Sequence, residues 1–437
     1  MAVQDHCVIV GGSIAGLLAA RVASEHFSHV TLIEREQLTD HDGPRKAVPQ
    51  GHHIHALLAR GQQILAELFP GLVADLEADG VPVGDFGTSL SWYFGGQMIR
   101  KVQTDLTCVA AGRPLFERHL RRRVEALPNV HVETGAEVTG LRAGERGGRV
   151  TGVGVHHVGS GRAGTYLDAD LVIDASGRGS RAPRWLEQLG YPAPEEDVVR
   201  MDLVYTTCDF EAPLEFDPIG DDIALIPVAT PELPRGAIFA RLSDRYAVSL
   251  TGILGDHPPR EMDAFLRYTA SLPVPAIHEA VSRATPMGPP ASFHFPASVR
   301  PRYDRMRRLP EGMVILGDAF ARFNPVYGQG MTVAALAADL LRRHLANGPV
   351  RSVAFARDLG RLVDAPWNLA AGADLGFPGV QGQRTVATRL GNAYISRLQR
   401  KASRDPHLSR TFLRVAGLVD SPAALLRPDV VARTLAA

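Results

Sequence analysis

The sequence predicts an α/β chain, in which a three-layer, Rossmann-like nucleotide-binding domain carries an inserted antiparallel β-sheet and is followed by a helical region. An apolar run over residues 7–10 leads into the glycine-rich turn Gly11–Gly16. A second such run, 313–316, leads into Gly317-Asp318 about three hundred residues later, and the runs between 198 and 254 alternate apolar and polar residues. Unbroken apolar runs indicate a buried parallel sheet, whereas alternation indicates strands with one exposed face.

Composition excludes several classes of protein. The 437 residues are 45% hydrophobic and 22% charged, with a formal net charge of +0, so no overall charge attracts nucleic acid or an anionic membrane. Three separated cysteines without C-x-x-C spacing argue against a disulfide framework. The polar N-terminus argues against a signal peptide, and the absence of a long apolar stretch argues against a membrane span. We therefore expect a soluble cytoplasmic protein.

The elements follow from local patterns along the chain. Strands are expected where short apolar or alternating runs stand between turn residues, at 7–10, 29–33, 130–132, 137–139, 150–155, 166–167, 171–173, 203–205, 223–228, 237–242, 246–250, 292–295 and 313–316. Helices are expected where apolar residues recur every three or four positions, at 14–24, 54–68, 113–127, 261–271, 275–284 and 331–341. A hairpin turn is expected at Gly159-Ser160-Gly161-Arg162.

These elements predict three parts of the chain. The nucleotide-binding domain is expected to be discontinuous, and the inserted layer should carry the substrate site. The helical region has no nameable motif and could pack against the first domain or form a homodimer contact. The expected bounds are 1–80, 105–185 and 300–345 for the first domain, 81–104 and 186–299 for the substrate domain, and 346–437 for the helical region.

The first glycine-rich turn, Gly11-Gly12-Ser13-Ile14-Ala15-Gly16, departs from G-x-G-x-x-G because Ser13 replaces the second glycine. Gly11 allows the tight turn, a small residue at 13 lets the backbone approach a pyrophosphate, and Gly16 permits close helix packing. The helix N-terminus offers free N–H groups to the phosphates. Glu34, about 20 residues further on, is placed to accept from a ribose hydroxyl. The motif predicts a dinucleotide site, with a plain βαβ turn as the alternative.

The second turn suggests which dinucleotide binds. Asp318 ends a buried strand, where it can accept from a polyol hydroxyl, and Pro325–Gly330 introduces a helix. The N-terminal dipole of that helix would suit the N1/C2=O group of a flavin. A third buried strand ends at Asp174, and Gly177 after it allows close approach of the backbone, although an ordinary turn is equally compatible. Two binding motifs at opposite ends of the chain favour FAD over NAD.

Two other features are weaker. His52, His53 and His55 contain a His-x-His spacing that can ligate metal, but no carboxylate stands at a convincing distance, so packing or pocket lining is favoured and no metal is expected. Arg45 and Lys46 lie in a Pro/Gly loop, where they are either solvated or in contact with flavin or nicotinamide. Hydrolase and nucleoside-triphosphatase motifs are absent from the sequence.

Gly11–Gly16 with Glu34, Asp174–Ser180 and Gly317-Asp318 together resemble the three fingerprints of class A flavoprotein monooxygenases, which share the para-hydroxybenzoate-hydroxylase-like fold. The resemblance covers about the first 345 residues. The segments 45–50, 172–180 and 317–331 look more specifically like the bacterial epoxidases of polyether-polyketide biosynthesis.

The resemblance implies a non-covalent FAD and a set of contacts. Glu34 and Arg35 would meet the adenosine ribose, Arg45 would lie near the flavin edge, and the loop after Asp318 would line the isoalloxazine. The full set is Gly11, Gly12, Ser13, Gly16, Glu34, Arg35, Arg45, Arg113, Val138, Asp174, Gly177, Asp318, Pro325, Gly328, Gly330 and Met331.

The resemblance also implies the chemistry. NAD(P)H would be a transient reductant, and a flavin C4a-hydroperoxide formed with O₂ would transfer one oxygen to an apolar small molecule. Epoxidation of a polyketide-type olefin is the first expectation and hydroxylation of an aromatic polyketide phenol the second. No catalytic side chain is identified. The inserted layer would supply the substrate pocket through Trp92, Tyr205, Phe239 and Phe295, each of which is also compatible with core packing.

Three other functions stay open. A flavin-dependent halogenase is disfavoured because its Trp-x-Trp-x-Ile-Pro motif is missing and Trp92, Trp185 and Trp367 stand alone. A reductase of isoprenoid double bonds would turn over without oxygen. A non-enzymatic flavin-fold protein would bind an intermediate without converting it.

Overall fold

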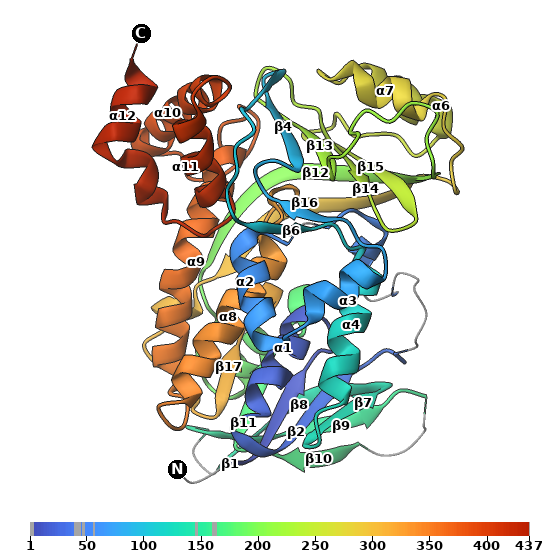
Figure 1. Ribbon diagram of the computed structural model, residues 1–437. Helices are drawn as coiled ribbons and strands as arrows, with labels where there is room; N and C mark the ends of the chain where they lie inside the picture. The colour runs from blue at the N-terminus through green and yellow to red at the C-terminus, as the bar shows by residue number, and fades with distance from the viewer. Residues whose placement is uncertain are drawn as a thin grey trace.

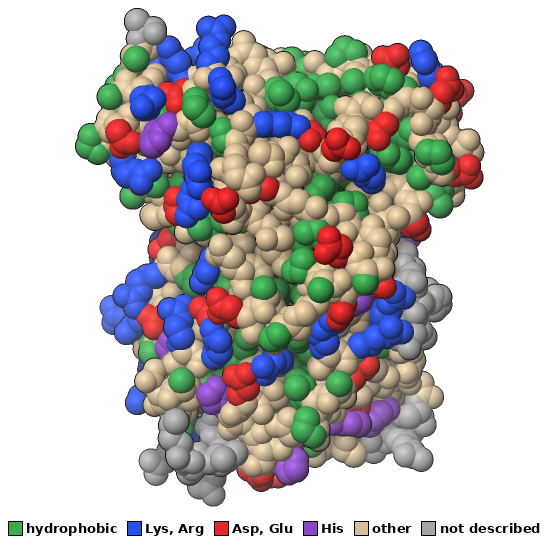
Figure 2. Space-filling model, viewed as in Figure 1, with side chains coloured by type: hydrophobic (Ala, Val, Ile, Leu, Met, Phe, Trp, Pro, Cys, Tyr) green, Lys and Arg blue, Asp and Glu red, His purple; other side chains and the backbone are tan. Residues whose placement is uncertain are grey.

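A computed structural model describes residues 4–38, 45, 49–55, 57–144, 147–159 and 164–436 of the chain. Three of the four residues of the expected turn at 159–162, and Lys46 with the two residues after it, lie outside the described residues. Figure 1 shows a lower part built on a parallel sheet, an upper part built on a large second sheet, and helices along one side. Basic and acidic side chains are interspersed over the face seen in Figure 2, in keeping with the net charge of +0.

The lower part is built on a five-stranded parallel sheet in the order β17-β11-β1-β2-β7. Its strands are β17 (Met313–Ile315), β11 (Leu171–Asp174), β1 (Gln4–Val10), β2 (Phe27–Glu34) and β7 (Val130–Thr134). Helices α1 (Ile14–Ala23), α4 (Arg113–Glu125) and α8 (Gln329–Leu345) form a second layer. A third layer is the antiparallel meander of β8 (Ala136–Ala143), β9 (Val150–His157) and β10 (Thr165–Asp168). Strands β11 and β17 are buried along their whole length, as their unbroken apolar sequence predicts.

The upper part is built on a seven-stranded sheet in the order β16-β12-β15-β14-β13-β4-β5. Its strands are β16 (Ala291–Pro301), β12 (Glu196–Glu211), β15 (Arg245–Gly252), β14 (Gly236–Arg241), β13 (Ala224–Val228), β4 (Leu90–Phe94) and β5 (Gln97–Met98). The pairs are antiparallel except for β13 with β4, which is parallel. Helices α6 (Met262–Ala270) and α7 (Pro275–Val281) cover one face of this sheet (Figure 1). The insertion is therefore an antiparallel sheet that gains a parallel edge from an earlier segment.

The helical region after residue 346 divides between the two parts. The long helix α9 (Ser352–Asp374) packs against α8 and β17, with Phe355, Leu359 and Val363 in the core of the lower part. Helices α10 (Val386–Ala402), α11 (Pro406–Ala416) and α12 (Pro428–Leu435) instead pack on the β4 edge of the large sheet. Figure 1 shows α9 running along the side of the molecule towards this second helical group.

Several shorter elements complete the chain. They are α2 (Ala59–Leu68), α3 (Leu72–Ala78), α5 (Ala182–Gln188), the strand pair β3 (Val83–Asp85) and β6 (Thr107–Val109), and 3₁₀ turns at 49–52, 177–179, 303–305, 317–319, 325–327 and 422–426. The helix expected from residue 54 begins only at Ala59, because the Leu58 N–H donates to the Thr332 hydroxyl on α8 at 3.0 Å. No helix formed by the described residues is long and apolar enough to cross a membrane.

Candidate functional site

A cavity of about 480 Å³ lies between the parallel sheet and the large upper sheet. Turns at the carboxyl ends of β1, β11 and β17 form one wall, which is where ligands bind in open α/β sheets. The strands β12, β14, β15 and β16 form the opposite wall. Of the sixteen residues expected to bind the cofactor, fourteen line this cavity: Gly11, Gly12, Ser13, Glu34, Arg35, Arg45, Arg113, Val138, Gly177, Asp318, Pro325, Gly328, Gly330 and Met331.

The turn after β1 has the close packing that its glycines predict. Gly11 has a φ of +105°, and a Cβ there would lie 2.6 Å from the carbonyl oxygen of Ala175. A Cβ on Gly16 would lie 1.8 Å from the carbonyl oxygen of Gly11, so Gly16 lies beneath the turn instead of lining the cavity. The α1 N-terminus has no side-chain cap, and Ile14 and Ala15 line the cavity. Its first N–H groups are therefore available to an anion.

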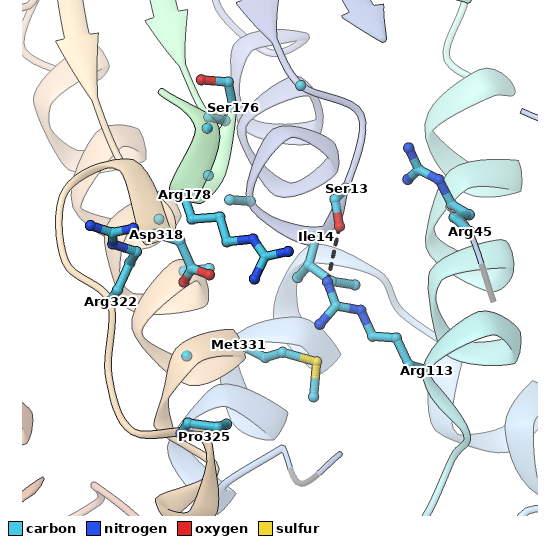
Figure 3. A pocket seen from close by; sticks show the side chains of 18 of the residues that line it. Ser13, Ile14, Arg45, Arg113, Ser176, Arg178, Asp318, Arg322, Pro325 and Met331 are labelled. Atoms are coloured by element: carbon cyan, nitrogen blue, oxygen red, sulfur yellow. Dashed lines mark hydrogen bonds between the residues drawn. The ribbon is translucent and has the colours of Figure 1, made fainter. Parts of the chain in front are cut away.

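A cluster of ion pairs lies beside this turn. Glu34 accepts from the Gly12 N–H at 2.9 Å and pairs with Arg45 at 2.9 Å. Arg45 also pairs with the buried Glu117 on α4, and Glu117 accepts from the Ser13 hydroxyl at 3.0 Å. Arg113 donates to the same hydroxyl at 2.9 Å (Figure 3). The Ser13 hydroxyl is thus bonded to protein groups, and Glu117 is a site residue that sequence reasoning missed.

Arg45 lines the cavity at its Glu34 end. Its guanidinium lies between the carboxylates of Glu34, Glu36 and Glu117, at the end of β2. Figure 3 shows it at the far side of the cavity from Pro325 and Met331. Three carboxylates thus hold Arg45 at the Glu34 end of the cavity, and its expected contact with the flavin edge stays a prediction.

The opposite side of the cavity carries Asp318 among arginines. Burial raises the pKa of Asp318, while the charges of Arg113, Arg322 and Arg178 act to lower it. Figure 3 shows Asp318 between Arg178 and Arg322. The Arg178 guanidinium also lies 4.9 Å from the centre of the Phe293 ring on the upper sheet. Arg322 could not be distinguished by sequence from the other arginines of the chain.

Asp174 supports the cavity from below without lining it. Its carboxylate is 0% exposed and accepts from the Ser176 N–H at 3.0 Å and from the Ser180 hydroxyl at 2.6 Å. These bonds hold the turn that brings Gly177, with a φ of +72°, to the cavity wall. The expected cofactor contact of Asp174 is thus replaced by a role in shaping the turn.

The segment after β17 lines the cavity through Pro325, Val326 and Gly328. The Asn324 side chain caps a 3₁₀ turn by accepting from the Val326 N–H at 3.0 Å, and Gly328 then begins α8 with a φ of +65°. We refer to residues 324–328 as the ring-end loop. A Cβ on Gly330 would lie 3.8 Å from Oδ1 of Asp318, so the start of α8 lies close to that carboxylate.

Strand register decides which upper-sheet residues face the cavity. Thr207, Ser249 and Ile238 are neighbours across β12, β15 and β14, and Ser249 and Ile238 line the cavity. Tyr205, two residues before Thr207, also lines it and pairs with Thr251 and Phe293. Because side chains alternate along a strand, these residues share one face of the sheet.

Two expected substrate-pocket residues lie elsewhere. Phe239 is 0% exposed and packs with Val248 under α6 and α7, because it stands one residue from Ile238 and so faces the opposite side of the sheet. Trp92 pairs with Ile226 on the β4 edge, stacks on Phe94 and belongs to the cluster shared with α10–α12. Tyr205 and Phe295 remain as expected at the cavity wall.

Of the histidines expected here, His55 lines the cavity and His53 packs against Tyr205, with the ring centres 4.3 Å apart. The described residues contain no group of three or more His, Cys, Asp and Glu side chains that could hold a metal. Burial, helped by the Arg113 charge, lowers the pKa of His55 to about 3. Its Nδ1 lies 2.9 Å from the His53 carbonyl, which only accepts, so Nδ1 carries the proton and Nε2 keeps a lone pair. His53 Nδ1 bonds to the Thr207 hydroxyl at 2.7 Å, and burial lowers its pKa to about 4.

The fold and the cavity define a dinucleotide-binding flavoprotein of the class A type. Residues 5–348 match the FAD binding domain family, and the chain belongs to that family. It is 35% identical over 451 residues to Protein Rv3254 of Mycobacterium tuberculosis (strain ATCC 25618 / H37Rv), covering 99% of this chain and 94% of the relative.

Two solved structures show how widely this fold is shared. One is the flavin-dependent brominase Bmp2, with a TM-score of 0.66, 17% identity and coverage of 94% of this chain and 93% of that chain. The other is PqsL, a probable FAD-dependent monooxygenase from Pseudomonas aeruginosa, with a TM-score of 0.60, 16% identity and coverage of 93% and 99%. The expected fold class and the FAD cofactor are thus confirmed, and the chain is an oxidoreductase of the flavin-dependent monooxygenase family.

The residues of the cavity fit FAD. An uncapped helix N-terminus and glycines without room for a Cβ suit a diphosphate. Six arginines and three acids line the cavity, a balance that favours an anionic ligand: Arg35, Arg45, Arg113, Arg178, Arg181, Arg322, Glu34, Glu137 and Asp318. The cavity continues from Glu34 and Val138 to the ring-end loop, as an extended dinucleotide requires.

Proposed function

We propose that this chain is an NAD(P)H-dependent FAD monooxygenase that oxygenates a small aromatic molecule carrying a hydroxyl group. The observation that supports this substrate class is the cavity face of the upper sheet. There, the rings of Tyr205, Phe293 and Phe295 on β12 and β16 lie beside the hydroxyls of Ser249 and Thr251 on β15. Such a wall suits a ligand with an apolar ring and a polar substituent better than a purely apolar chain.

In this proposal FAD runs from one end of the cavity to the other. The adenosine lies at Glu34 and Val138, the pyrophosphate at the uncapped start of α1, and the ribityl chain at Asp318. The isoalloxazine lies between the ring-end loop and the upper sheet, with the uncapped N-terminus of α8 near N1 and C2=O. When bound, FAD accepts electrons from NAD(P)H and activates O₂, which the side chains of this cavity cannot do.

The polar groups of the upper sheet then orient the substrate. His55 Nε2 has no hydrogen-bond partner among the described residues and accepts from a substrate hydroxyl. The Ser249 hydroxyl lies 2.5 Å from that of Thr207, which continues to His53 Nδ1 at 2.7 Å. This chain of hydroxyls can orient a phenol by hydrogen bonding, and a hydrogen bond accepted from the phenol O–H makes its ring more electron-rich towards electrophilic oxygen.

Epoxidation of a polyketide-type olefin is the second candidate. It is favoured by the similarity of segments 172–180 and 317–331 to polyether epoxidases and by the apolar Ile54 and Ile238 at the cavity wall. Halogenation is disfavoured because no lysine lines the cavity among the described residues and the paired tryptophans are missing.

Isotope transfer tests the proposal. The FAD-loaded protein is incubated with NAD(P)H, ¹⁸O₂ and matched pairs of phenols and olefins, and products are analysed by mass spectrometry. The proposal expects one ¹⁸O in a hydroxylated ring, with His55→Gln and Ser249→Ala raising KM for the phenol while FAD content is kept. Label only in epoxides would favour the second candidate. Reduction of substrate without O₂, or halide-dependent product, would refute oxygen transfer.

A further inference from the structure

Asp374, the last residue of α9, is bonded to the ring-end loop from outside the part of the chain that matches the FAD binding domain family. Its Oδ1 accepts from Nδ2 of Asn324 at 2.8 Å and from the hydroxyl of Tyr327 at 2.9 Å. Asn324 in turn caps the turn that contains Pro325 and Val326. One carboxylate oxygen therefore holds the first and fourth residues of a five-residue loop whose other side lines the cavity.

This carboxylate lies in an unfavourable place. Asp374 is 3% exposed, and its Oδ2 is buried without a hydrogen-bond partner among the described residues. Burying an unpaired carboxylate oxygen costs free energy. An acid at the C-terminal end of a helix also opposes the helix dipole. The charge of Asp374 therefore stabilises neither the helix nor the core. Its favourable contacts are the two hydrogen bonds to the ring-end loop.

The charge of Asp374 is poised to change near neutral pH. Burial raises the pKa of its carboxyl to about 7, even though the bonds from Tyr327 and Asn324 act to lower it. The groups packed around it are the phenol of Tyr327, whose own pKa is raised by burial and by Asp374, and the neutral amide of Asn324. On α10, the neighbouring Asn392 is neutral and donates to the Gly372 carbonyl at 2.7 Å.

We propose that Asp374 is a positioning residue for the flavin, which holds the ring-end loop against the isoalloxazine through Asn324 and Tyr327. The C-terminal region is then part of the cofactor site, through α9. This inference rests on the proposed orientation of FAD, but not on the identity of the substrate. Because the carboxylate holds the loop by accepting two hydrogen bonds, its protonation changes the loop contacts and hence the environment of the ring.

The test compares four variants of the full chain by flavin absorbance, FAD dissociation constant and midpoint potential between pH 5.5 and 8.5. Asp374→Ala removes both bonds, and we expect FAD to bind about tenfold more weakly, equivalent to ~1.4 kcal/mol, with a shifted flavin spectrum. Asp374→Asn keeps an acceptor without the charge, and we expect near-normal affinity but loss of the spectral titration near pH 7. Tyr327→Phe should shift that titration while leaving the carboxyl in place.

Asp358→Asn is the matched control, since Asp358 lies on the same helix but on the surface, paired with His344 at 3.0 Å. It should retain the wild-type spectrum and titration. The proposal is refuted if the flavin spectrum of Asp374→Asn titrates near pH 7 like that of the wild-type protein. This measurement remains decisive even if Asp374→Ala fails to fold. Unlabelled product with a normal flavin response would refute the proposed oxygen transfer alone and leave Asp374 in its role.

Discussion

The buried carboxyl of Asp374 gives the stability of the chain a pH dependence that can be calculated. Its pKa rises from 3.8 to about 7 on folding, mainly because of burial. Between these values the folded chain keeps a proton that the unfolded chain releases, so stability falls as pH rises and levels off about one unit above the folded pKa, near pH 8. At about 1.4 kcal/mol per unit, the full loss is about 4 kcal/mol, of which roughly 3 kcal/mol falls between pH 5 and pH 8.

Asp374→Asn removes this titration. The free energy of unfolding, measured with urea at pH 5 and pH 8 on FAD-saturated and FAD-free protein, should therefore fall less with pH in the variant than in the wild-type chain, by roughly 3 kcal/mol. Subtracting the pH-dependent change in unfolding free energy of the variant from that of the wild type removes the contributions of the other titrating groups. Asp358→Asn, at the surface of α9, should keep the wild-type slope. Equal slopes for Asp374→Asn and wild type would show that the carboxyl ionises normally and would refute the reasoning.

Five further substitutions test the site. Gly16→Ala should abolish FAD binding, because its Cβ would lie 1.8 Å from a backbone oxygen. Gly391→Ala, on α10 away from the cavity, meets nothing within 4 Å and should keep the 450 nm absorbance. Arg113→Gln loses the bond to the Ser13 hydroxyl and a charge facing Asp318, so titration calorimetry should show FAD binding about tenfold more weakly. Ile238→Trp should raise KM for substrate without loss of flavin, while Phe239→Ala should leave KM unchanged and lower the free energy of unfolding by about 3–5 kcal/mol. If Phe239→Ala lost substrate affinity and Ile238→Trp did not, the observed register of β14 would be contradicted.

The parts of the fold that depend on local pattern could be predicted from the sequence. The helix expected at 14–24 is α1 at Ile14–Ala23, and the strand expected at 29–33 lies within β2, because periodicity and turn residues set these bounds. The helix expected from residue 54 begins at Ala59 after an extended Leu58, since a hydroxyl on α8 binds the Leu58 N–H. That bond joins residues 274 positions apart, so no local pattern reports it.

The site, like the fold, has a part that local motifs predict and a part that depends on contacts between distant residues. Motifs at strand ends identified most of the cavity wall, because a strand, a turn and a helix lie close together in sequence. Glu117 was missed because its partner Arg45 is 72 residues away, and Asp374 because Asn324 is 50 residues away. Phe239 was assigned to the wrong face because the choice depends on a one-residue register, and both Ile238 and Phe239 are apolar enough for either face.

The two ends of the cofactor site therefore differ in how they are built. At the Glu34 end, the turn after β1 and the acid at the end of β2 belong to one βαβ unit, which forms from local contacts. At the other end, the ring-end loop has an αL glycine and a single capping amide, and that amide is fixed by a carboxylate from α9. In the proposed orientation of FAD, fixing the ring would require α9 to be docked, although the family match ends before that helix begins. It follows that substitutions on the buried face of α9 should change the environment of the flavin ring more than they change the affinity for adenosine and pyrophosphate.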